Sequence, residues 1–124
     1  MSDLQRFYDA IGSELKPVIE RLGGNAEITK RFKKKFAADG SFGDLEKALD
    51  GNNTQEAFRA AHTLKGVSAN LGLEQLRRSA SELTELLRPE SDTVPQEAGA
   101  LMEQVRLDYQ LTVDSIRAFM ASEQ

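Results

Sequence analysis

The stretch TQEAFRAAHTLKGVSANLG, residues 54–72, shows most clearly how this chain folds. Wound at about 100° per residue, it gathers small and apolar side chains on one side. These are Ala57, Ala60, Ala61, Leu64, Val67, Ser68 and Leu71. Asn53 followed by Glu56 is typical of a capped helix start, and Gly72 is typical of a helix end. The stretch therefore predicts a helix over about 54–71 with one side in the core.

The same spacing predicts the fold class. Apolar residues recur at intervals of three and four along nearly the whole chain, and no segment alternates like a strand. We expect further helices at about 4–11, 15–22, 25–36, 41–49, 73–88 and 96–121, and a polar loop at 89–95. Four substantial helices with short connections indicate an all-α, antiparallel four-helix bundle with one or two short additional N-terminal helices. The length of 124 residues fits a single domain, 1–124.

Composition excludes several classes of protein. A net charge of −4 argues against a nucleic-acid partner, and no apolar run approaches the length of a membrane span. There is no cysteine, which excludes disulfides and thiolate metal sites, and no signal peptide opens the chain. We therefore expect a cytoplasmic monomer. The basic run KRFKKKF at 30–36 is interpreted as the solvated face of a helix, or alternatively as a contact for an acidic partner.

His62 is the only histidine, and it falls roughly opposite the centre of the core stripe of 54–71. The residues around it at helical offsets are Gln55, Phe58, Arg59, Lys65, Gly66 and Ala69. Gly66 in mid-helix costs about 1 kcal/mol relative to alanine. Together with Ala69 it leaves the surface beside the imidazole almost bare. We predict an exposed imidazole that another molecule can approach, with an exposed Phe58 as the apolar anchor.

His62 could serve several kinds of chemistry. A metal site is disfavoured because there is no second histidine and the helical neighbours are not carboxylates. A Ser-His-Asp hydrolase needs a pocket and an oxyanion hole, for which the sequence gives no signal. A phosphorus nucleophile needs an accessible neutral imidazole, a cation for the phosphoryl oxygens and room for an in-line donor. Lys65 and Gly66 offer the cation and the room, whereas a surface histidine without function is the plain alternative.

The segment AAHTLKGVSANLG at 60–72 resembles the signature of histidine-containing phosphotransfer (HPt) domains, His-x-x-Lys-Gly followed by Ser-x-x-Leu-Gly. ERLGGNAEITKRFKKKF, SFGDLEKALDGNNTQEAFRAAH and LEQLRRSASELTELL are similar to the helices that flank this signature, so the resemblance covers about 15–121. It implies a four-helix bundle that takes a phosphoryl group from the aspartyl phosphate of a receiver domain and passes it to another receiver. It also implies no ATP site, no autokinase activity and no cofactor, because the divalent metal belongs to the receiver.

Carried onto this chain, the resemblance makes His62 the phosphoacceptor, Lys65 the phosphoryl-stabilising cation and Gly66 the residue that permits close approach. Ser68 and Leu71 occupy motif positions that point coreward. Docking of a response-regulator receiver or a hybrid sensor kinase is assigned to the surface around His62, namely Gln55, Phe58, Arg59, Gly66 and Ala69. The family often places a polar residue on the next helix to orient the imidazole. Thr84 stands there, and its short side chain leaves the ring orientation open.

Two alternative functions remain. The dimerisation and phosphoacceptor domain of a sensor kinase typically has an acidic residue directly after its histidine, whereas Thr63 stands here and no nucleotide-binding domain fits in the chain. A helical adaptor would bind a receiver or another partner through the Phe58 patch without any phosphotransfer. The sequence leaves the adaptor open.

Overall fold

The computed structural model describes residues 2–36, 39–88 and 92–122, and every regular element within these ranges is a helix. The α-helices are α1 (Asp3–Ala10), α2 (Leu15–Leu22), α3 (Asn25–Arg31), α4 (Ser41–Asp50), α5 (Thr54–Leu71), α6 (Glu74–Leu87) and α7 (Ala98–Ser122). A π-helical turn, η1 (Phe32–Phe36), continues α3. The predicted all-α class is thus confirmed. The predicted polar loop at 89–95 falls partly on 89–91, outside the described residues.

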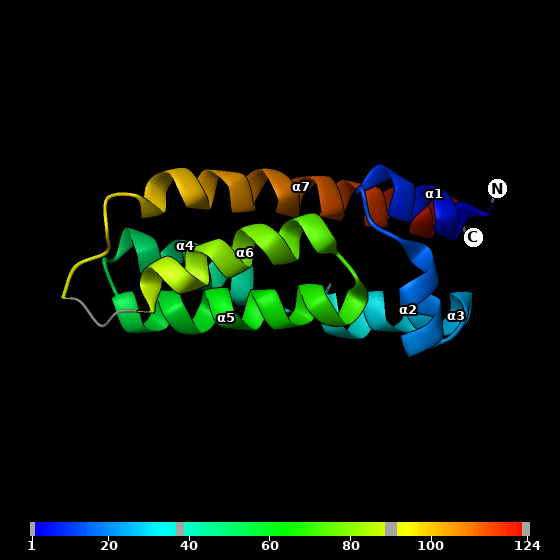
Figure 1. The fold of residues 1–124 in the computed structure, drawn as a ribbon, viewed down its shortest axis with the longest axis horizontal. Helices are drawn as coiled ribbons and strands as arrows, with labels where there is room; N and C mark the ends of the chain where they lie inside the picture. Colours follow the sequence, from blue (N-terminus) through cyan, green and yellow to red (C-terminus); the bar gives the residue numbers. More distant parts are fainter. Residues whose placement is uncertain (1, 37–38, 89–91, 123–124) are drawn as a thin grey trace.

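The helices form the predicted antiparallel bundle. Figure 1 shows α5, α6 and α7 running alternately back and forth, with α4 behind α6 and the short α1 and α2 at the end where both termini lie. The ring of Tyr109 on α7 stacks on Phe42 of α4, with centroids 4.0 Å apart, and lies 5.5 Å from Phe36 of η1. The fourth side of the bundle is therefore shared between α4 and η1.

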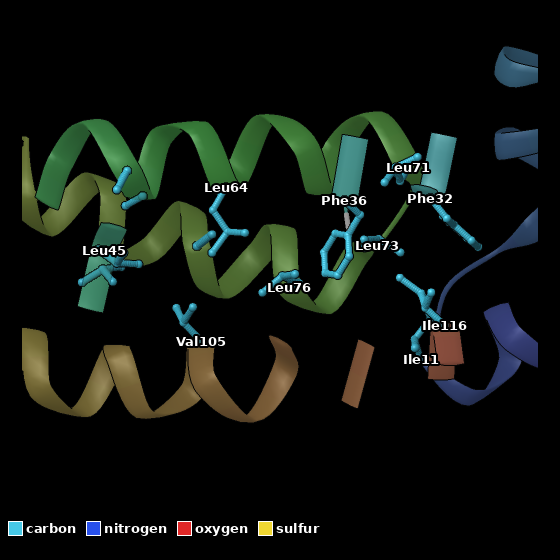
Figure 2. Packing of buried hydrophobic residues seen from close by; sticks show 14 of the residues in the cluster. Ile11, Phe32, Phe36, Leu45, Leu64, Leu71, Leu73, Leu76, Val105 and Ile116 are labelled. Carbon is cyan, nitrogen blue, oxygen red and sulfur yellow. The ribbon is translucent and has the colours of Figure 1, made fainter. Parts of the chain in front are cut away.

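Leucines and aromatic rings fill the space between the helices. Figure 2 shows Leu45, Leu64, Leu76 and Val105 pointing inward from four different helices. At the other end of the core, the ring of Phe32 lies 4.9 Å from that of Phe7 on α1 and 5.8 Å from that of Phe119 on α7. This aromatic cluster joins the N-terminal helices to the bundle.

The basic run at 30–36 has the expected arrangement. Phe32 and Phe36 are buried, whereas Lys33, Lys34 and Lys35 between them are exposed. The prediction that the two phenylalanines of this run are core residues is therefore confirmed. In the part of the chain that the structure covers, no helix is both long enough and apolar enough to cross a membrane.

Candidate functional site

Helix α5 is fixed at both ends by the residues that the sequence indicated. At its start the Asn53 side-chain oxygen accepts a hydrogen bond of 3.1 Å from the backbone N–H of Glu56. At its end Gly72 has φ 69°, and a Cβ there would run into the side chain of Val18. Glycine is the residue that takes this left-handed conformation most easily. The helix that carries His62 therefore has a defined length and phase.

The core side of α5 is the one predicted. Every small or apolar residue of the predicted stripe is buried except Val67, which is half-buried. The hydroxyl of Ser68 donates to the carbonyl of Leu64 over 2.7 Å, so Ser68 and Leu71 are both interior residues. His62 is exposed on the opposite side, as the helical phase predicted.

The imidazole of His62 lies against the ring of Phe58, one turn earlier on α5. The two ring centroids are 6.0 Å apart and the planes differ by 11°, an offset parallel stack. Helical side chains lean toward the N-terminus of their helix, which brings residue 62 over residue 58. The imidazole borders a groove of about 440 Å³, lined by Thr54, Gln55, Phe58, Arg59, His62, Leu87 and Arg88.

The prediction that Phe58 stands exposed is wrong. Its side chain is half-buried and packs against the core, because the end of α6 lies beside it. The guanidinium carbon of Arg88 is 5.2 Å from the centre of the Phe58 ring, a cation–π distance. Phe58 therefore forms a wall of the groove between α5 and α6 rather than a free-standing anchor.

Arg88 is a site residue that the sequence reasoning missed. It is the C-cap residue that directly follows α6, and it lines the same groove as His62. A signal was present, because position 88 is one helical turn after Thr84, the α6 position expected to face the imidazole. Arg88 also donates two hydrogen bonds of 3.0 and 2.8 Å to the carboxylate of Glu85.

The two predicted cations lie on different sides of His62. Arg59 is exposed, borders the groove, and forms an ion pair of 2.6 Å with Glu56. Lys65 is half-buried and lies within electrostatic reach of α6. Hydrogen bonding from Arg88 lowers the pKa of the Glu85 carboxyl, and the positive charge of Lys65 acts in the same direction.

The surface after His62 is bare, as predicted. Gly66 and Ala69 are exposed, and a Cβ added to Gly66 would meet no other side chain within 4 Å. We call the exposed surface at Gly66 and Ala69 the bare strip. It ends at Arg21 of α2, whose guanidinium donates to the carbonyls of Ala69 and Asn70 over 3.0 and 2.9 Å. Nothing in the sequence pattern indicated that Arg21 reaches this end of α5.

The Thr84 hydroxyl does not donate a hydrogen bond to the imidazole. The side chain is fully buried, and its hydroxyl donates to the carbonyl of Ala80 over 2.7 Å. In the described part of the chain, the Phe58 ring is the group found against the imidazole. Within that part there is also no group of three or more His, Asp or Glu side chains that could hold a metal ion.

A comparison with protein-family models identifies the domain. The model of the Hpt domain matches residues 37–117, about two thirds of the chain. The chain belongs to the Hpt domain family. No curated protein and no solved structure gave a significant match. The Hpt match spans α4, α5, α6 and most of α7, so α1, α2, α3 and η1 precede the matched region.

Membership in the family carries a role. Hpt domains are histidine phosphotransfer modules of phosphorelays, and they work with response-regulator receivers and kinases. They are not themselves kinases or ATP-binding catalysts.

Proposed function

We propose that this Hpt domain is a phosphorelay intermediary in which His62 carries the phosphoryl group. It accepts the group from the aspartyl phosphate of one receiver and passes it to an aspartate of another. The observation that carries the proposal is the placement of the chain's only histidine. It stands exposed on α5, opposite the core, between a bare strip at Gly66 and a groove bordered by Arg59 and Arg88.

On the side of this chain, the proposed transfer uses His62 and the groups around it. The lone pair of the unprotonated ring nitrogen attacks phosphorus, and the other ring nitrogen keeps its proton. A P–N bond forms while the bond from phosphorus to the aspartyl oxygen breaks, and the aspartate leaves as a carboxylate. Lys65 offsets the charge on the phosphoryl oxygens. Transfer to the next receiver reverses these steps.

In this proposal the receiver docks over the groove at Phe58 and the bare strip at Gly66 and Ala69. A partner can come close to the helix there because these positions have almost no side chain. Gln55 and Arg59 border the same surface. The domain acts as a cytoplasmic monomer, without a cofactor or autokinase activity of its own, and the divalent metal is supplied by the receiver.

The decisive experiment is transfer of labelled phosphate from a panel of phosphorylated receivers to the wild-type protein and to His62→Gln. We expect acid-labile, base-stable label on the wild type alone, because glutamine keeps polarity and removes the nucleophile. The variant should still bind the receiver. Equal labelling of His62→Gln would overturn the proposal, and binding without label from any receiver would favour the adaptor.

A further inference from the structure

We propose that Phe58 is a positioning residue, whose ring holds the imidazole of His62 in the orientation that transfer requires. This inference rests on the proposed function and names a second residue on which the same site depends. Thr84 does not supply this orientation, because its side chain is fully buried and donates to the Ala80 carbonyl within α6, whereas the imidazole is exposed on α5. The stack between the two rings does.

The contact restricts how the imidazole can turn. An exposed side chain otherwise samples several rotamers, and transfer would proceed from only some of them. At a centroid distance of 6.0 Å and 11° between the planes, the Phe58 ring favours the rotamers that lay the imidazole parallel to it. His62 is thereby held over the turn that precedes it.

The stack leaves the nucleophile open. The lone pair of an unprotonated imidazole nitrogen lies in the plane of the ring and points outward from its edge. An offset parallel neighbour covers part of a ring face and leaves the edge free. Phe58 can therefore fix the ring while both nitrogens remain accessible for in-line attack. An edge-to-face contact at the same position would have covered the edge.

Phe58 is itself held in place. It packs against the core on one side, and the Arg88 guanidinium lies over its ring at 5.2 Å. Arg88 in turn makes two hydrogen bonds to Glu85 on α6. The orientation of the imidazole thus depends on the packing of α5 against α6 through a chain of three contacts.

The first test compares Phe58→Leu with Phe58→Tyr, which keeps the ring. Single-turnover transfer from a phosphorylated receiver is measured over a range of receiver concentrations. We expect Phe58→Leu to lower the maximal rate about three- to tenfold, the range of an aromatic pair. The half-saturating concentration should change less than the rate, although Phe58 also forms a wall of the docking groove. Phe58→Tyr should transfer at the wild-type rate. Phe42→Leu is the matched control, because Phe42 is also a half-buried, stacked phenylalanine but lies on α4.

A small phosphodonor separates positioning from reactivity. Phosphoramidate approaches from any direction, so its reaction with His62 should slow less in Phe58→Leu than transfer from the receiver does. Thermal unfolding of each variant checks that the bundle is folded. A loss for Phe58→Leu that lies only in the half-saturating concentration, or no loss at all, would overturn the positioning role.

A second measurement is independent of any receiver. NMR of the wild type should show contacts between the ring protons of His62 and Phe58, and a ring-current shift of the imidazole that disappears in Phe58→Leu. Identical imidazole spectra in the two proteins would overturn the inference. If the shift is seen and the wild type accepts no phosphate from any receiver, the stack stands and the proposed function alone falls.

Discussion

The cations around His62 differ in how they are held. Arg59 is paired with Glu56 and Arg88 with Glu85, in each case with the residue three positions earlier. Lys65 forms no ion pair with any residue that the structure describes. An exposed ion pair stabilises a protein by at most about 1 kcal/mol, so either arginine could exchange its glutamate for a phosphoryl group. Lys65 has no ion pair with a described residue to give up before it contacts the phosphoryl group. This makes Lys65 the first candidate to contact the phosphoryl oxygens.

Replacing Lys65 with methionine keeps the aliphatic stem and removes the charge. We expect the maximal rate of transfer from a saturating receiver to fall on the order of tenfold. This is less than a fully desolvated donor would give, because Lys65 is only half-buried. Docking should weaken less than the rate. Lys47→Met, at an exposed position on α4, is the control, and a loss confined to docking would make Lys65 a binding residue only.

Single residues were predicted well where one helix decides their surroundings. The exposure of His62 and the open space at Gly66 follow from winding 54–71 alone. The exposure of Phe58 was wrong and Arg88 was missed, because both depend on how the end of α6 lies against α5. A helical projection has no information about a second helix.

At the scale of the element, α5 contains a glycine that its own geometry does not require. Gly66 lies inside the helix, and an added Cβ would meet no other side chain within 4 Å. Because helical side chains lean toward the N-terminus, a larger residue at 66 would lie over the turn that bears His62. In the proposed function, the glycine allows a partner to approach, at a cost to helix stability.

Substitutions at position 66 can therefore distinguish an effect on helix stability from an effect on receiver docking. Gly66→Ala should raise the free energy of unfolding by about 1 kcal/mol and the melting temperature by roughly 4 °C. Gly66→Leu should also fold, but it should weaken receiver binding at least about tenfold by covering the approach to the imidazole. Thermal unfolding and binding titrations measure the two effects.

Gly43→Leu, at an exposed and equally open position of α4, is the control for the added side chain. It should leave receiver binding unchanged. Unaltered binding of Gly66→Leu would show that the partner does not approach over this strip.

The helix expected at 25–36 divides into α3 and the π-helical turn η1. The sequence could not show this division. The spacing of apolar residues over five positions distinguishes a helix from a strand. It does not distinguish an α-helical turn from a π-helical turn. Both phenylalanines of η1 are buried in either case, so the predicted core was correct although the local geometry was not.

At the scale of the whole molecule, the N-terminal helices support the helix that carries His62. The Tyr8 hydroxyl of α1 donates to the carbonyl of Leu71 over 2.8 Å, and Arg21 of α2 binds the two preceding carbonyls. The end of α5 is thus completed by residues that precede the Hpt match at 37–117. Periodicity predicted that such helices exist, but not these contacts, which join residues more than 45 positions apart.

Burial raises the pKa of the Tyr8 phenol, and the positive charge of Arg21 opposes this only in part. An unfolded tyrosine ionises near pH 10, so the folded protein resists ionisation where the unfolded chain does not. The stabilising contribution of the buried neutral phenol is therefore complete below about pH 10 and is lost as the pH rises above that value. Burial also raises the pKa of Tyr109, with Asp39 and Glu46 adding to the effect, so two tyrosines contribute to the alkaline loss.

Tyr8→Phe should lower the free energy of unfolding at pH 7 by about 1–2 kcal/mol, because the buried Leu71 carbonyl loses its donor. Above pH 10 the variant should lose stability less steeply than the wild type, since one of the two phenols whose pKa is raised is gone. Urea denaturation between pH 7 and 11 measures both effects. Tyr109→Phe is the control, because it removes a phenol without touching the end of α5. Parallel alkaline slopes for Tyr8→Phe and the wild type would show that Tyr8 is not held neutral by burial.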